Sequence, residues 1–300
     1  MDVFSRSWSL FKSSWSVVRS EPSLLWFPVL SALLVIIASV VFFGLLGALF
    51  VLNPDVQRTL VDAAQTAEGG EGSPLLTLIG IAVLFVYYLI VGAIATYFAT
   101  GMAGAALRKL DGQDTSFGEG IRIANSRLGA ILGFSVIAAT VGVILSMLRN
   151  NREGGNTAGA ILAAIGGLAW NVATFLVVPV IADRSVNAIG AIKESALLLR
   201  KTWGEQLVGS GGLGLIFGLA SAVVVMLTVL LLVVVSDIAG LFWILLGLSV
   251  TTLIVLAVLN STLSGIYKAA VYRYAAQRQV APQFDATLIE GAFRLKGAAA

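Results

Sequence analysis

Six long apolar runs, joined by short polar connections, are the feature that most constrains how this chain can fold. Each run has 20 or more residues, enough to cross a hydrocarbon layer roughly 30 Å thick at about 1.5 Å per residue. Backbone polar groups in hydrocarbon must be satisfied internally, and the runs are too long for barrel strands of about 10 alternating residues. The sequence therefore predicts six transmembrane helices, at 24–52, 75–107, 129–148, 158–182, 207–235 and 241–263.

The composition agrees with a membrane protein. Of the 300 residues, 58% are hydrophobic and 12% charged, whereas soluble domains are about 45–50% apolar and about 25% charged. The fold class that we expect is all-α, a polytopic integral membrane protein. It would have three parts: an amphipathic interfacial helix at 1–23, the transmembrane domain at 24–263, and a cytoplasmic C-terminal extension at 264–300.

The positive charges are distributed unevenly between the connections. Sixteen of the nineteen Lys and Arg residues lie in the N-terminal segment, the connections after the second and fourth runs, and the C-terminal tail. The alternate connections carry only Arg58, Arg149 and Arg152. By the positive-inside rule, both termini are expected on the cytoplasmic side. The same rule accounts for the net charge of +3, so no nucleic-acid partner is expected.

The segment before the first run has the spacing of an amphipathic helix. Trp8, Phe11, Trp15 and Val18 recur at steps of three and four, and Lys12 lies off this stripe. Such a helix can lie in the headgroup zone with its aromatic side chains down. Alternatively, the stripe packs on the protein's own helices. The first reading makes Trp8, Phe11, Lys12 and Trp15 candidate interfacial residues.

Similar segments precede the third and fifth runs, which suggests a two-span unit used three times. Before the fifth run, Arg200, Lys201 and Trp203 echo the cation and tryptophan of the N-terminal segment. Glu205 and Gln206 open the run itself. A carboxylate there is favourable beside the helix dipole, and it could also contact a lipid headgroup. These five residues complete the candidate interfacial set.

Polar and amphipathic side chains at mid-depth occur in the even-numbered runs. In hydrocarbon their hydroxyl, amide and indole groups need partners. They could line a central cleft that holds a lipid tail or a small amphiphile. They could equally form interhelical hydrogen bonds, each contributing about 0.6–2 kcal/mol. The candidate cleft residues are Tyr87, Tyr88, Thr96, Trp170, Asn171, Thr174, Thr251 and Thr252.

Reactive chemistry is not evident in the sequence. The chain has neither Cys nor His, the residues that supply thiol nucleophiles, the usual near-neutral base and most metal ligands. Proton relays and ion pathways usually require charged residues within the membrane. No charged residue lies in the middle of a run. Asp111, Asp114 and Glu119 share one connection and could bind a divalent cation. Three carboxylates in one loop are, however, too common to indicate a metal site. We therefore expect no enzyme, no catalytic residues, no cofactor and no metal.

Four stretches carry a resemblance to a known family. They are the opening residues 7–15 and the segments 178–183, 191–195 and 200–206, which read VPVIAD, AIKES and RKTWGEQ. They resemble DUF6159, a family of uncharacterised prokaryotic six-span proteins, over most of the chain. The layout is more distantly similar to YciC-like proteins and to membrane domains of some glycerophosphodiester phosphodiesterases. The resemblance implies a multi-pass protein of the prokaryotic plasma (inner) membrane, and no activity.

The sequence thus favours a non-catalytic membrane protein that engages lipids or a partner protein through its cytoplasmic face and a central cleft. Membrane lipids are the expected partners, with a membrane-protein partner or a homo-oligomer as further possibilities. The alternative is a permease or channel subunit for a neutral or amphipathic small solute. An intramembrane enzyme is the least favoured class.

Overall fold

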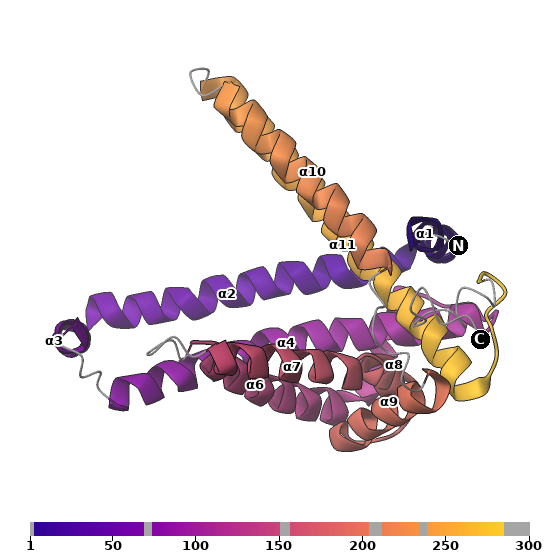
Figure 1. Ribbon diagram of the computed structural model, residues 1–300, viewed down its shortest axis with the longest axis horizontal. Coiled ribbons are helices and arrows are strands. Elements are labelled where there is room, and N and C mark those ends of the chain that lie inside the picture. The colour runs from indigo at the N-terminus through magenta and orange to yellow at the C-terminus, as the bar shows by residue number, and fades with distance from the viewer. Residues whose placement is uncertain (1–2, 69–73, 151–156, 204–211, 235–238, 285–300) are drawn as a thin grey trace.

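The computed structural model describes residues 3–68, 74–150, 157–203, 212–234 and 239–284, and these form helices joined by turns, with no strand among them. Figure 1 shows their arrangement. In chain order the elements are α1 (Val3–Ser20), the 3-10 helix η1 (Pro22–Leu25), α2 (Trp26–Leu52), α3 (Pro54–Glu68), α4 (Pro74–Leu110), α5 (Phe117–Ser126), α6 (Leu128–Asn150), α7 (Thr157–Ala173), α8 (Val177–Asp183), α9 (Ala188–Trp203), α10 (Gly212–Val234) and α11 (Ala239–Gln277).

Five helical segments in the described part of the chain are long and apolar enough to cross a membrane, which confirms the membrane character expected from composition. They are Pro22–Leu52, Leu76–Leu110, Leu128–Arg149, Ile161–Asp183 and Gly240–Gln277. The fifth predicted span, 207–235, corresponds to α10, whose described apolar stretch Phe217–Val233 is shorter. The start of that predicted span lies outside the described residues.

The packed core lies at one end of the molecule, which we call the hub. There α1, η1, α5, α8 and α9 gather around the C-terminal parts of α4 and α11 (Figure 1). With 37 and 39 residues, α4 and α11 extend over 50 Å at about 1.5 Å per residue, so both reach beyond a bilayer core. The predicted boundary at 263/264 falls inside α11 without a break. The largest fully buried hub side chains include Leu24, Phe27, Leu110, Ile181, Leu199, Ile266 and Tyr272.

Away from the hub the helices diverge in two directions: α2 runs with the group α4–α6–α7, which it contacts through α4, and the hairpin α10–α11 points elsewhere (Figure 1). Among the described elements, α10 packs chiefly against α11 and α1. No residue in the most apolar stretch of α2, α4 or α11 is buried; Val40 on α2 is 68% exposed and Trp243 on α11 67%. Helices that are apolar on all sides need a membrane around them.

The fourth predicted span is interrupted. α7 ends at Ala173 and α8 begins at Val177, with Pro179 in the first turn of α8, where its missing N–H is not needed. At the interruption the backbone N–H of Leu176 donates to Ser195 Oγ at 3.0 Å, which satisfies a buried group. The bend at this break directs α8 into the hub.

The closest helix approach in the hub joins α4 and α5 at two glycines. A Cβ atom built on Gly120 would lie 2.6 Å from the carbonyl oxygen of Gly101, and one built on Gly101 would lie 3.0 Å from that of Gly120. The Phe27 ring touches both positions and packs on Phe117 with ring centroids 4.7 Å apart. Because any side chain at either glycine would separate the helices, this crossing requires glycine.

Candidate functional site

A polar network in the hub ties α11 to α8 and α9. The Tyr272 hydroxyl donates to Asp183 Oδ2 at 2.7 Å and accepts from Arg184 Nε at 3.2 Å. Arg184 also forms an ion pair with Glu194 of α9. Burial by itself would lower the pKa of Arg184, but the Tyr272 hydroxyl and the nearby carboxylates raise it, so the guanidinium stays charged. The network fixes α8 against the last long helix.

Positive side chains hold the C-terminal end of α4. Arg273 donates to the carbonyl oxygen of Leu110, and its Nε lies 2.9 Å from Asp111 Oδ1. Lys109 Nζ is 3.8 Å from Glu21. The last carbonyls of a helix lack partners within the helix and favour cations. Gly112, with φ of +76°, then ends α4 in the left-handed conformation that glycine adopts without strain. The end of α4 is therefore joined to both η1 and α11.

A second charged cluster lies where α5 begins. Ser116 caps the helix by accepting from the N–H of Glu119. Glu119 Oε1 lies 2.5 Å from Arg122 Nη2 and 3.0 Å from Arg108 Nη1. The hydrogen bond from Arg122 lowers the pKa of Glu119, and the charge of Arg108 adds to the effect. Among the described residues no group of three or more His, Cys, Asp or Glu side chains could hold a metal ion, and that includes Asp111, Asp114 and Glu119.

The positive-inside rule accounts for the charges of Arg184 and Arg273, and no sequence pattern predicts the role of Tyr272. The available signal was the length of the apolar pattern after the last span. Ala269, Ala270 and Val271 continue it beyond residue 263, and all three are buried. An apolar helix that continues past the membrane indicates a packed core there.

The aromatic stripe of α1 packs on the protein and also remains partly open. Trp8, Phe11 and Trp15 stack in a row, with neighbouring centroids 5.2 and 6.2 Å apart. Phe11 meets Phe217 of α10 at 6.1 Å, while Trp8 is 44% exposed. Lys12 is exposed, with Nζ 5.9 Å from the Trp8 ring. Both interpretations of the stripe thus retain support.

The second interfacial group is only partly described. Arg200 and Lys201 lie exposed in the last turn of α9. Trp203 is the last residue of that helix. Glu205 and Gln206 lie outside the described residues.

The eight candidate cleft residues are not gathered around one cavity. Tyr87 packs on Phe42 and Phe43 of α2, with centroids 5.4 and 5.0 Å apart, and its hydroxyl is 3.1 Å from Ser39 Oγ. Trp170 stacks on Phe134 at 6.3 Å. These two contacts are interhelical packing of the kind that the structural interpretation predicts.

The threonines of this set bond within their own helices or lie buried. Thr174 donates to the Trp170 carbonyl at 2.7 Å. Thr251 and Thr252 of α11 donate to carbonyls four residues earlier at 2.8 Å. Thr96 is buried in α4, and Asn171 is exposed on α7. Because α11 diverges from α4 and α7 (Figure 1), its two threonines lie apart from the others.

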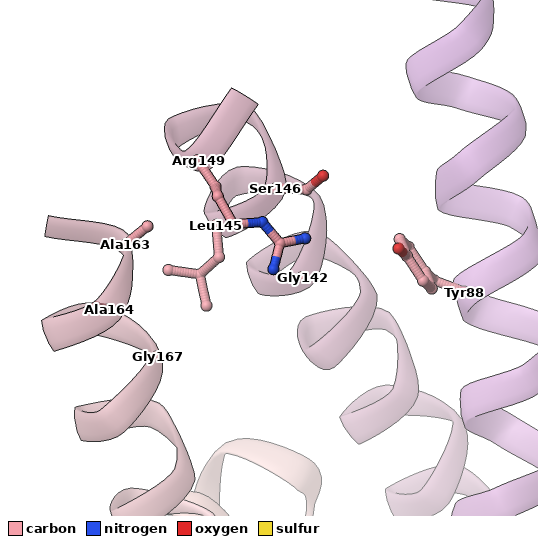
Figure 2. A pocket seen from close by; sticks show the side chains of 8 residues that line it. All are labelled: Tyr88, Gly142, Leu145, Ser146, Arg149, Ala163, Ala164 and Gly167. Carbon is pink, nitrogen blue, oxygen red and sulfur yellow. The ribbon is translucent and has the colours of Figure 1, made fainter. Parts of the chain in front are cut away.

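Tyr88 lines a hollow of about 560 Å³ between α4, α6 and α7. Figure 2 shows Tyr88 projecting from α4 toward α6, and the guanidinium of Arg149 bending back along α6. The floor is made of small residues, and a Cβ atom built on Gly142 would meet nothing within 4 Å apart from the adjacent backbone of its own helix. The complete lining is Tyr88, Gly142, Leu145, Ser146, Arg149, Ala163, Ala164 and Gly167.

A comparison with protein families places the chain in a known family. The profile of a family of unknown function, DUF6159, matches residues 78–281, from the second long helix to the end of the hub. No curated protein matches the chain, and no solved structure matches it.

Proposed function

This chain belongs to the DUF6159 family, whose function is unknown, and we propose that it is a non-catalytic integral membrane protein that binds lipids between its diverging spans. The observation that carries the proposal is the contrast between its two ends. The hub is packed and ion-paired, whereas α2 and the α10–α11 hairpin leave it in different directions, and outside the α2–α4 and α10–α11 contacts their apolar surfaces are exposed. Acyl chains can cover such surfaces inside a membrane without exposing any polar backbone group.

The proposal places six spans in a prokaryotic plasma membrane, with the hub and both termini on the cytoplasmic side. The positive-inside distribution supports this orientation, as does the exposure of Lys12, Lys193, Arg200 and Lys201 at the hub. The sixth span would be α10. The order of elements also fits a threefold repeat, since α1, α5 and α9 each precede a pair of long apolar helices.

At the cytoplasmic side, the hub would meet lipid headgroups. α1 joins an exposed Trp8 to exposed Lys12 and Arg19, a combination suited to the zone where tails meet headgroups. The charges on α9 would extend this surface. The same cationic face could also bind an acidic region of a membrane-protein partner. Lipid is the partner that we propose because both the apolar spans and the cationic face can bind it.

Extraction from nanodiscs tests the proposal. Protein from nanodiscs of phosphatidylcholine and phosphatidylglycerol is transferred to mild detergent, and the phospholipids that stay bound are counted by native mass spectrometry. We expect several retained phospholipids per chain, because lipids in the angles between helices exchange more slowly than lipids around a closed bundle. A chain free of lipid under conditions that keep it folded would contradict the proposal.

A further inference from the structure

The hollow between α4, α6 and α7 brings together three polar groups that lack a partner. Among the described residues, no hydrogen bond or ion pair joins the Tyr88 hydroxyl, the Ser146 hydroxyl or the Arg149 guanidinium to another group. All three line the same hollow. Two hydroxyl donors and a fork of guanidinium N–H groups are therefore available to one ligand.

The hollow extends from the middle of a span to its end. Tyr87 contacts Ser39, the middle residue of α2 (Trp26–Leu52), and Tyr88 follows it. The hollow therefore begins at the level of the centre of that span. It ends at Arg149, the last residue of the span Leu128–Arg149. Arg149 is exposed at the end of its span, the level at which long cationic side chains meet lipid headgroups, so the site favours a ligand that brings a negative charge.

From these observations we propose that the hollow binds an anionic phospholipid, with its phosphate on Arg149, Ser146 and Tyr88. The planar guanidinium matches two phosphate oxygens at once, and each hydroxyl can donate to a remaining oxygen. The volume of about 560 Å³ lies within the range of roughly 300–1,000 Å³ that small-ligand sites occupy.

Small residues give this site its room for a tail. Gly142 on α6 and Ala163, Ala164 and Gly167 on α7 face the hollow, and side chains of ordinary size there would fill it. An acyl chain can lie on this smooth floor while the head reaches the three polar groups. A free phosphate ion would leave the floor uncovered, which is why the geometry favours a lipid. In the proposed orientation the lipid comes from the outer leaflet.

This inference rests on the proposed lipid-binding function and adds charge selectivity at one place. The test uses full-length protein in nanodiscs with equal phosphatidylglycerol and phosphatidylcholine, followed by native mass spectrometry of the retained lipids. We expect wild-type protein to retain phosphatidylglycerol preferentially. Arg149→Gln should reduce this preference at least tenfold, which corresponds to about 1.4 kcal/mol. Arg58→Gln, on the exposed helix α3, should leave the preference unchanged.

A second variant tests the hollow without changing a charge. Gly142→Leu has room for its side chain and should also abolish the preference by filling the site. Gly129→Leu, on the same helix and equally unobstructed, should not.

Unchanged selectivity in both Arg149→Gln and Gly142→Leu, with lipid still bound, would overturn the inference and leave the proposed function standing. Loss of all lipid from wild-type protein would contradict both. Displacement of the lipid by millimolar inorganic phosphate would identify a free-anion site and overturn the inference.

Discussion

Gly120→Ala is expected to lower the thermal stability of the purified protein and to loosen α5 from α4. The added Cβ atom would lie 2.6 Å from the carbonyl oxygen of Gly101. That oxygen belongs to the backbone of a 37-residue helix, so α5 must move, and the Phe27 ring between the helices must move with it. Overpacking of this kind costs on the order of 1–3 kcal/mol. Thermal unfolding followed by tryptophan fluorescence in detergent measures the loss.

Gly118→Ala is the matched control, because it lies on the same helix and changes the same atoms. A Cβ atom there meets nothing closer than Ser116 Oγ at 3.9 Å. Alanine favours a helix over glycine by about 1 kcal/mol, so this variant should be as stable as the wild type or more so. Equal stability of the two variants would show that the glycine crossing does not hold the hub together.

Tyr272→Phe is expected to destabilise the hub by removing the centre of its polar network. The ring, which is fully buried, stays in place, so the change isolates the hydroxyl group. Asp183 loses its donor at 2.7 Å and Arg184 its acceptor at 3.2 Å. Because Asp183 and Arg184 are exposed to water on their other sides, we expect a loss of about 0.5–1.5 kcal/mol for each of the two hydrogen bonds, the net contribution of a typical one. The same thermal unfolding assay measures this loss.

Tyr97→Phe serves as the control, since its hydroxyl bonds Asn125 Oδ1 at 2.8 Å in an exposed position where water can replace it. Its effect should be clearly smaller. The double variant Tyr272→Phe with Asp183→Asn should be less destabilised than the sum of the two single variants, because groups in one network are coupled. Strict additivity would mean that Tyr272 and Asp183 do not act together.

The helical layout was predictable from the sequence because apolar length and period report directly on membrane helices. The predicted span 129–148 became α6, Leu128–Asn150, and the run 24–52 became η1 with α2, ending at the same Leu52. The largest departure is at the fourth span, which Pro179 and its neighbours divide into α7 and α8. Helix ends in polar connections follow caps and tertiary contacts, so their positions were less predictable.

The hub could not be read from the pattern of apolar runs. Its contacts join residues far apart in the chain, such as Asp183 with Tyr272 and Leu110 with Arg273. Single-sequence periodicity carries no information about which helices meet. The positive-inside rule alone accounts for the charges of Arg184 and Arg273. Nothing in the sequence therefore pointed to their structural role in the hub.

The candidate cleft was predicted because its polar residues lie at a similar depth in the membrane. Depth alone does not determine on which side of its helix a side chain points. Tyr87 and Tyr88 are neighbours in sequence, yet one packs on α2 and the other lines the hollow beside α6. Arg149 was regarded as a loop charge, and the hollow that it enters became visible only when α6 and α7 were placed together. The sequence signal for it was the run of small residues on α7.

Distance measurements between spin labels in nanodiscs test the central claim that the spans diverge from the hub. The chain has no cysteine, so introduced cysteines alone carry the labels. One pair joins Leu49 of α2 to Leu230 of α10, and the reference pair joins Leu230 to Leu248 within the hairpin; all three positions are exposed. We predict a much longer distance for the first pair than for the second. Equally short distances, as in a closed bundle with helix axes about 8–10 Å apart, would contradict the claim.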